Sequence, residues 1–155
     1  MYVMSKGLNS TFNISRLTQE SISDLIIPND YFNGGVTSFV LSNNADLKRI
    51  AIGNYTFENV RLFELNGLSE LESVVIGEES FTYATAQNDM ESSERGDGIY
   101  RVMNCPKLAS IRIGNYSFSD YHSFELANLP SLQSIEIDQY VFYWVSTFSL
   151  ISFID

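Results

Sequence analysis

The sequence has little cysteine or histidine, and each of these two shortages excludes a class of protein. Among 155 residues there are one Cys, one His and three Pro. With Cys105 alone, the chain forms no internal disulfide and no zinc site built from several cysteines. With His122 alone, it has no HExxH motif and no other metal motif that needs two histidines. We therefore expect neither a metal nor a cofactor.

Positive charge is also scarce. Lys and Arg number 9 against 19 for Asp and Glu, which gives a formal net charge of −10. Binding to a phosphate backbone depends on clustered Lys and Arg, so no nucleic-acid partner is expected. No apolar run reaches the roughly 18 residues of a membrane span, and residues 1–21 lack the apolar core of a secretory signal. The compartment stays open: cytoplasmic if the N-terminus is native, the cell surface if the chain is a piece of an adhesin.

What the sequence does contain is a repeat. Residues 47–70 and 108–131 share IGNY, then Ser or Thr before Phe, then FEL, all at the same offsets. Self-similarity at a fixed period of 24 residues indicates a solenoid, in which each repeat packs only on its neighbours. The chain divides into an N-terminal half-unit or cap at 1–21 and a repeat array at 22–155, with units 22–46, 47–70, 71–107 (carrying an insertion at about 83–97), 108–131 and 132–155.

The unit reads L-x-x-I-x-I-G-x-x-S/T-F at positions 1 to 11, followed by F-x-L at positions 17 to 19. Its apolar positions 1, 4, 6 and 11 resemble those of the leucine-rich repeat, L-x-x-L-x-L-x-x-N-x-L. More narrowly, the chain is similar to the divergent BspA-like group. The resemblance covers residues 22–155 and implies a solenoid that binds other proteins, as surface adhesins and intracellular scaffolds do. Position 9 holds Tyr or Glu in place of the usual Asn, so the Asn ladder of that family is not expected.

Both motifs alternate inward and outward residues, as half-buried strands do. In the second unit, for example, Ile50 and Ile52 are the inward pair. No segment has the 3.6-residue periodicity of an amphipathic helix. We therefore expect a mainly β solenoid of about five coils, with two short strands per coil and few or no helices. Gly53, Gly77 and Gly114 follow the first strand and are expected to permit a sharp corner.

Outward positions carry charges that alternate in sign between neighbouring units. At position 18, for example, Glu64, Arg101 and Glu125 follow one another. Equivalent positions in neighbouring parallel coils lie about 4.8 Å apart, so opposite charges favour this register. Outward positions 2, 3 and 5 also supply the candidate partner-binding residues. These are Lys48, Arg49, Glu72, Ser73, Ser110, Arg112, Ser134 and Glu136.

The polar insertion in the third unit is a second candidate for binding. Insertions in solenoids form loops on one face, which is often the binding face. This one contains Arg95-Gly96-Asp97, a tripeptide that can act as an integrin-type adhesion sequence, although a loop without function is the simpler interpretation. Its acids lack the spacing of a calcium-binding loop. The candidate loop residues are Asp89, Glu91, Glu94, Arg95, Gly96 and Asp97.

Some chemically notable residues have structural interpretations. Cys105 shares position 22 with Leu68 and Leu129, so a small buried hydrophobe is expected there. His122 is expected to face solvent. The Phe residues of position 11 are expected to form an internal stack. The Tyr residues of position 9 are expected to pack on its flank, with sugar binding as the alternative; they are Tyr55, Tyr116 and Tyr140.

The last unit is unusual because residues 140–154 carry no charge. Solenoids normally end in a polar cap. We therefore expect either a piece of a longer array or an open end that pairs with another chain.

The expected function is non-enzymatic binding of a protein partner, within a larger adhesin-like or scaffold protein. A self-assembling unit that associates through the C-terminal coil is the first alternative. A β-helix carbohydrate-active enzyme is the second. It is disfavoured because the chain has no G-x-S-x-G, P-loop or G-x-G-x-x-G motif and its strand acids sit in charge-matched pairs.

Overall fold

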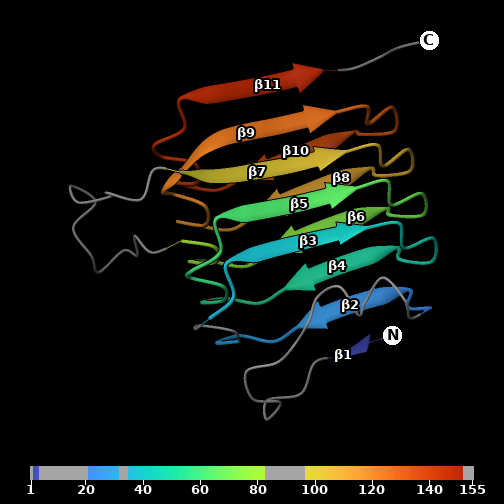
Figure 1. Ribbon diagram of the computed structural model, residues 1–155, viewed down its shortest axis with the longest axis horizontal. Helices are drawn as coiled ribbons and strands as arrows, with labels where there is room; N and C mark the ends of the chain where they lie inside the picture. Colours follow the sequence, from blue (N-terminus) through green and yellow to red (C-terminus); the bar gives the residue numbers. More distant parts are fainter. Residues whose placement is uncertain (1, 4–20, 32–34, 83–96, 152–155) are drawn as a thin grey trace.

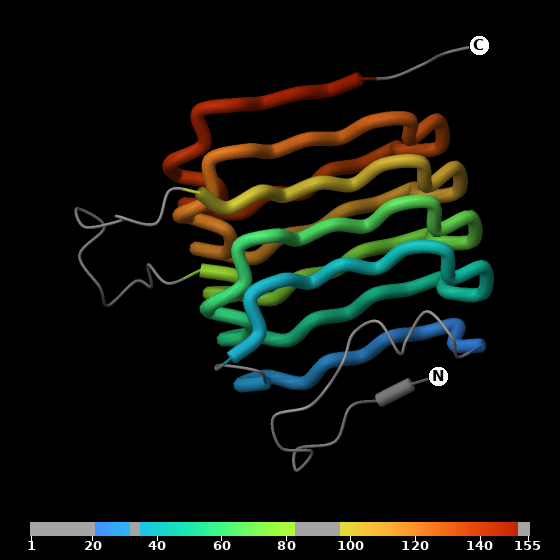
Figure 2. Tube along the Cα trace, in the orientation of Figure 1, coloured from blue at the N-terminus to red at the C-terminus, as the bar shows by residue number. Residues whose placement is uncertain are grey.

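The computed structural model describes residues 2–3, 21–31, 35–82 and 97–151. Within these ranges the chain is a β-solenoid of parallel strands without a helix, as the repeat predicts (Figure 1). Each coil contributes its I-x-I strand to one sheet and its F-x-L strand to a second sheet that faces the first. Figure 2 shows the coils stacked along one axis, with the first and last coils at opposite ends.

The five I-x-I strands and the N-terminal β1 form a six-stranded sheet in the order β1-β2-β4-β6-β8-β10, here called sheet A. Its strands are β1 (Tyr2–Val3), β2 (Asp24–Ile27), β4 (Arg49–Ile52), β6 (Ser73–Ile76), β8 (Ser110–Ile113) and β10 (Ser134–Ile137). The F-x-L strands form a five-stranded sheet in the order β11-β9-β7-β5-β3, here called sheet B. Its strands are β3 (Ser38–Ser42), β5 (Leu62–Asn66), β7 (Gly98–Met103), β9 (Tyr121–Ala127) and β11 (Thr147–Ile151).

The register pairs equivalent repeat positions between neighbouring coils. Ile50 pairs with Val74 in sheet A, and Glu64 pairs with Arg101 in sheet B. The one irregularity among the described strand pairs is a register shift at Gly98/Ile99, where the chain returns from the insertion. The charge alternation at position 18 therefore predicted the register correctly.

Two ladders of aromatic rings fill the space between the sheets. The position-11 ladder has centroid spacings of 4.8 to 5.3 Å and consists of Phe57, Phe81, Phe118 and Phe142. The F-x-L ladder has spacings of 4.9 to 5.2 Å and consists of Phe39, Phe63, Tyr100, Phe124 and Phe148. The two ladders meet edge to face, as in the pair Phe63–Phe81, whose centroids lie 5.1 Å apart at 81°. Stacking along a ladder and edge contacts between ladders are both favoured by the ring quadrupoles.

The corner from sheet A to sheet B contains left-handed residues at two positions of the repeat. Positions 9 and 11 have φ between 50° and 60° wherever they are left-handed, as at Tyr55 and Phe57. Gly53, Gly77 and Gly114 have no positive φ. A Cβ on Gly77 would lie 2.7 Å from the carbonyl carbon of Gly53, so glycine is required by the close approach of the coils. These glycines are thus needed after the strand, as expected, but for the close stacking of the coils and not for a left-handed torsion at the corner.

Side chains on either side of position 9 bond the corner backbone. At position 8 the Oδ1 of Asn54 accepts a hydrogen bond from the Glu78 N–H at 3.0 Å, and Asn115 repeats this contact one coil from the C-terminal end. At position 10 the Ser117 hydroxyl accepts from the Ser80 N–H at 3.0 Å and donates to the Gly77 carbonyl at 2.7 Å. Position 9 thus has no Asn ladder, as expected, but Asn side chains at position 8 bond the backbone of the next coil.

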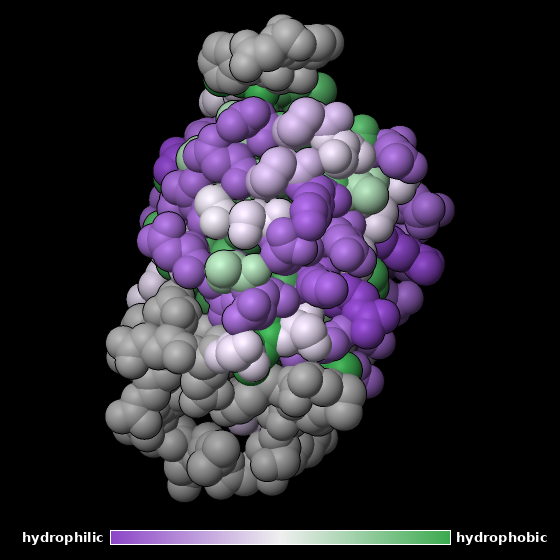
Figure 3. Space-filling model, turned by 90° about the vertical axis from the view of Figure 1, so that its right-hand side faces the viewer, coloured by the Kyte–Doolittle hydropathy of each residue, from purple (hydrophilic) through white to green (hydrophobic). Residues whose placement is uncertain are grey.

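The return corner, from sheet B to sheet A, is polar. One left-handed position recurs there, occupied by Asn43, Gly67, Asn104 and Asn128. Asn104 donates from Nδ2 to Asn66 at 2.9 Å and accepts from Asn128 at 3.0 Å. Figure 3 views this side of the molecule and shows a largely hydrophilic surface.

Candidate functional site

The outer side of sheet A carries two straight rows of side chains. Positions 4 and 6 of β2, β4, β6 and β8 are buried, so positions 3 and 5 face away from the core. The register keeps each position aligned across the strands. We call this surface the A face. Its position-3 row is Asp24, Arg49, Ser73, Ser110 and Ser134, and its position-5 row is Ile26, Ala51, Val75, Arg112 and Glu136.

The structure brings the predicted partner-binding residues together on this surface. Arg49, Ser73, Ser110, Arg112, Ser134 and Glu136 lie in the two rows. Lys48 and Glu72 come one residue before β4 and β6 and are exposed at the border of the A face. The Lys48 carbonyl accepts hydrogen bonds from the Glu72 and Ser73 N–H groups at 2.7 and 3.3 Å. Within the described chain the side chains of Lys48 and Glu72 form no ion pair, although their positions are adjacent.

In the two ion pairs of the A face both arginines are open to solvent, whereas the Asp24 side chain is only 15% exposed. Arg49 pairs with Asp24, and Arg112 lies 3.8 Å from Glu136 with side chains 62% and 68% exposed. Hydrogen bonds from the Ser23 hydroxyl and from Arg49 lower the pKa of Asp24, and the bond to Asp24 raises the pKa of Arg49. Exposed pairs contribute little to stability, so the charges of the A face remain available to a partner.

Between these charges the position-5 row of the A face is apolar and the position-3 row carries serines. Ala51 pairs with Ile26 on one side and with Val75 on the other. Val75 is 43% exposed, and the next residue in its row is Arg112. Small and apolar side chains between charged ones are compatible with a protein interface, whose centre is usually less charged than its rim.

The outer side of sheet B has a different electrostatic character. Arg101 donates to Glu125 at 2.7 Å and to Glu64 at 3.3 Å. The hydrogen bond from Arg101 lowers the pKa of Glu125, and the bond to Glu125 raises the pKa of Arg101. All three side chains are at most 30% exposed. Here the charges satisfy one another, which distinguishes this side from the A face.

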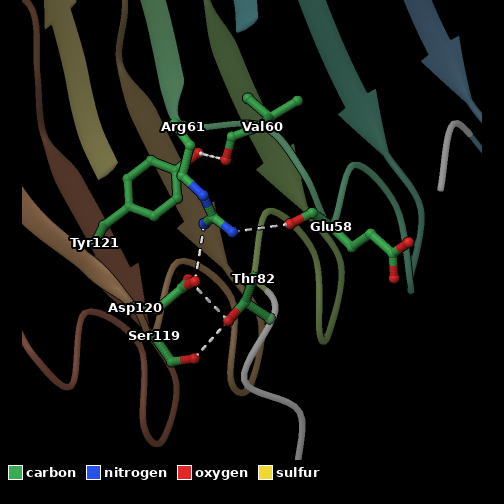
Figure 4. A network of polar contacts seen from close by, with 7 residues as sticks. All are labelled: Glu58, Val60, Arg61, Thr82, Ser119, Asp120 and Tyr121. Carbon is green, nitrogen blue, oxygen red and sulfur yellow. Dashed lines mark hydrogen bonds and ion pairs between the residues drawn. The ribbon is translucent and has the colours of Figure 1, made fainter. Parts of the chain in front are cut away.

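A buried polar network lies where the insertion leaves the coil (Figure 4). Arg61 donates from Nη1 to Asp120 at 2.8 Å, and the Asp120 side chain is 1% exposed. Thr82 donates to Asp120 at 3.1 Å and shares a 2.6 Å hydrogen bond with the Ser119 hydroxyl. Arg61 also reaches the Glu58 carbonyl at 3.4 Å. The network joins the second and fourth units and includes Thr82 of the third.

The Tyr121 side chain is buried beside this network. Its hydroxyl donates to the Val60 carbonyl at 2.7 Å, and its ring is fully buried. A Cβ on Gly98 would lie 2.6 Å from that ring, so glycine makes the room for it. Burial, followed by the charge of Asp120, raises the pKa of the Tyr121 hydroxyl. The base of the insertion is therefore a rigid, well-packed part of the solenoid.

The sequence did not reveal this network. Arg61 and Asp120 belong to units that are not neighbours, and a repeat alignment compares only neighbouring coils. The one signal in the sequence was the insertion itself, which interrupts the repeat after Thr82. Among the candidate loop residues, the structure describes Asp97, which is exposed just before β7. The others, Asp89, Glu91, Glu94, Arg95 and Gly96, lie outside the described residues.

The predictions for the remaining notable residues have different outcomes. Cys105 is fully buried, donates to the Met103 carbonyl at 3.2 Å and has its pKa raised by burial, so the prediction of a buried structural residue is confirmed. His122 is only partly exposed, and its Nδ1 is enclosed without a hydrogen-bond partner, so the expectation of a solvent-facing side chain is wrong. Tyr116 and Tyr140 lie at the corner surface with stacked rings 4.7 Å apart.

Within the described ranges, no three His, Cys, Asp or Glu side chains come together in a group that could hold a metal ion. The same residues include no helix of the length and apolarity that crossing a bilayer requires. No protein-family model, curated protein or solved structure matches the chain.

Proposed function

We propose that the chain is a non-enzymatic protein-binding module that uses the A face. The supporting observation is that the eight residues predicted from positions 2, 3 and 5 share one continuous exposed surface on a rigid ladder. The resemblance to leucine-rich repeats supports the same assignment, because solenoids of that kind use extended strand surfaces to bind proteins. A larger adhesin-like or scaffold protein is the context that this resemblance implies.

The A face is favoured over the outer side of sheet B by its electrostatics. Arg49 and Arg112 are 67% and 62% exposed, whereas Arg101 on sheet B is 30% exposed and held by two carboxylates. A partner carboxylate can replace the weak intramolecular partner of Arg112 at small cost. Displacing Glu64 and Glu125 from Arg101 would leave two acids without their cation. The partner is therefore expected to present acidic and basic groups around a flat apolar centre.

The inserted loop supplements the A face in this proposal. Its two ends are fixed by the Arg61–Asp120 network and by Gly98, so the loop is carried on a rigid base. Rigid scaffolds with variable loops are a common arrangement for binding sites.

Photo-crosslinking tests the proposal. A photoreactive amino acid replaces Val75 or Arg112 on the A face, and matched controls replace Val40 or Ser123 on the outer side of sheet B. We expect one discrete partner to be crosslinked from both A-face positions and from neither control. Excess unlabelled wild-type chain should compete for it, and the variant Arg49→Glu/Arg112→Glu should not. Equal crosslinking from both sheets, or none from the A face, would refute the assignment.

A further inference from the structure

Position 9 of the repeat forms a row of side chains at the corner from sheet A to sheet B. All five coils have the same backbone conformation there, with φ between 50° and 60°. The Tyr55 N–H donates to the Glu78 carbonyl of the next coil at 2.9 Å. The same contact joins Glu79 to Asn115 at 2.8 Å, so the corners of successive coils superpose and these side chains leave the backbone in one direction. We call them the position-9 row, which consists of Asp30, Tyr55, Glu79, Tyr116 and Tyr140.

Neighbouring tyrosines in this row stack on one another. The ring centroids of Tyr116 and Tyr140 lie 4.7 Å apart at an interplanar angle of 13°, close to the spacing of about 4.8 Å between adjacent parallel strands. Tyr55 and Tyr116 are two coils apart, and the coil between them holds Glu79. Two coils span about 9.6 Å, beyond the reach of ring stacking. The two rings therefore flank Glu79 without contacting each other.

The exposure of this row does not depend on the last coil. Tyr55, which has further coils on both sides, is 46% exposed, and Tyr140 of the last coil is 45% exposed. Glu79 and Tyr116 are half-buried. The row therefore presents its side chains to solvent along the whole corner.

The Glu79 carboxylate lacks the cation that other strand and corner acids have. Glu125 is held by Arg101, and Glu136 lies near Arg112. Within the described ranges, by contrast, no Lys or Arg forms an ion pair with Glu79. Positions 7 to 9 of the five units contain no Lys or Arg at all, and their acids are Asp30, Glu78, Glu79 and Asp138.

The carboxylate and the two rings attract the same kind of ligand. The negative face of a tyrosine ring attracts a cation that lies within about 6 Å of its centroid. A group held at Glu79 is one coil spacing, about 4.8 Å, from the position of each ring along the row. A guanidinium suits this arrangement better than an ammonium, because it is planar, donates two parallel hydrogen bonds to a carboxylate and stacks on aromatic rings.

A sugar, the other ligand that the tyrosines suggest, fits less well. Stacking on a pyranose needs a ring face that is open to solvent, whereas Tyr116 and Tyr140 turn faces toward each other. The neighbouring amides are also engaged, since the Oδ1 atoms of Asn54 and Asn115 accept hydrogen bonds from the backbone of the next coil. The row therefore offers a cation more than it offers a sugar.

We propose that Tyr55, Glu79 and Tyr116 form a cation-binding site whose ligand is an arginine side chain of a partner protein. Glu79 accepts two hydrogen bonds from the guanidinium, and the two tyrosines pack on either side of it. The net charge of −10 adds a long-range attraction for a basic segment. None of the three residues belongs to the A face, so this site does not rest on the function proposed above.

Titration of the full chain with Nα-acetyl-arginine amide tests the proposal, with NMR of labelled tyrosine rings as the readout. We expect saturable shifts at Tyr55 and Tyr116 and a dissociation constant on the order of 10 mM, as for one exposed ion pair and two cation–π contacts. Added salt should weaken binding. Nα-acetyl-citrulline amide has nearly the same shape without the charge and should not bind, and the lysine analogue should bind more weakly than the arginine compound.

Substitutions within the row assign the contacts. Glu79→Gln should raise the dissociation constant at least about threefold. Tyr55→Leu should raise it about two- to fivefold, whereas Tyr55→Phe keeps the ring and should bind like wild type. Glu79→Tyr places in the third coil the residue that three other coils carry, so it should keep the fold and lose binding. Glu70→Gln, at the return corner, is the control and should have no effect.

Four results would each overturn the proposal. They are no saturable binding by the wild-type chain, equal binding of the arginine and citrulline compounds, equal binding of the arginine and lysine compounds, and an affinity that Glu79→Gln leaves unchanged. Circular dichroism of every variant separates a lost contact from a lost fold. Because Tyr55→Leu and Tyr55→Phe differ by the ring, a loss shared by both would also count against the site.

Discussion

Tyr100 stacks on Phe124 with ring centroids 5.1 Å apart and an interplanar angle of 6°, yet its hydroxyl is buried without a hydrogen-bond partner. In each of the other coils this position holds a Phe, at Phe39, Phe63, Phe124 and Phe148. The ring of Tyr100 thus continues the ladder, while its hydroxyl has lost water and gained no protein partner. A buried polar group in that state costs free energy.

Replacing Tyr100 by Phe should therefore stabilise the fold. The substitution keeps the stacked ring and removes the unsatisfied hydroxyl, so we expect the free energy of unfolding to rise by about 1 kcal/mol. Chemical denaturation measures this change. Tyr55→Phe, which removes an exposed hydroxyl, is the control and should have no effect. A loss of stability in Tyr100→Phe would show that the hydroxyl has a partner.

The same residue makes the fold sensitive to alkali. Burial, and to a lesser extent Cys105, raises the pKa of Tyr100 far above that of an unfolded tyrosine. Above about pH 10 the unfolded chain releases this proton while the folded chain retains it, so the folded state loses stability relative to the unfolded state as the pH rises. We expect the free energy of unfolding to fall above this pH. The slope should be shallower in Tyr100→Phe, by up to about 1.4 kcal/mol per pH unit. Equal slopes would contradict the assignment.

The repeat period and the charge columns were enough to predict the solenoid and its register. Glu64, Arg101 and Glu125 illustrate why: each unit constrains only its neighbours, so a pattern that is local in space is also visible between adjacent units of the sequence. The outward rows of the A face follow from the same alternation.

What the sequence could not predict depends on contacts that skip a coil or on main-chain torsions. Arg61 and Asp120 are 59 residues apart and belong to units that are not neighbours, so a comparison of adjacent repeats does not pair them. The left-handed conformation of Phe57 and Tyr55 is uncommon for such bulky residues, and it is imposed by packing and by hydrogen bonds between coils. The role of Gly53 beside them was predicted from the conformational freedom of glycine. Here the absence of a Cβ instead prevents a steric clash with the neighbouring coil.

Two glycines should respond differently to substitution because they are required for different reasons. Gly67 is left-handed at φ 68°, and a Cβ there would meet nothing closer than 3.8 Å. Asn occupies the same corner in other coils, so Gly67→Asn should change stability by less than about 0.5 kcal/mol. Gly77→Ala forces a Cβ against Gly53 and should cost about 1–3 kcal/mol. Thermal or chemical denaturation of both variants distinguishes the two roles, and equal costs would contradict them.

Acid should weaken the charged column of sheet B. The hydrogen bond from Arg101 lowers the pKa of Glu125. The stability that Glu125 contributes is therefore present above the unfolded value of about 4.3 and is lost as the pH falls through the lower folded value. Arg101→Gln should be less stable than wild type at neutral pH, and the difference should shrink between about pH 5 and pH 3. Arg112→Gln, whose partner is exposed, should show little difference from wild type at either pH.

The Arg61–Asp120 pair should be the most costly ion pair to break. Removing Arg61 leaves the buried Asp120 carboxylate without its cation, whereas removing Arg112 leaves an acid that water can solvate. We expect Arg61→Met to lower the free energy of unfolding by about 3 kcal/mol and Arg112→Met by less than about 0.5 kcal/mol. The double variant Arg61→Met/Asp120→Asn should regain part of the loss, since the buried charge is gone. If Arg61→Met and Arg112→Met cost the same in urea denaturation, the network of Figure 4 does not fix the base of the insertion.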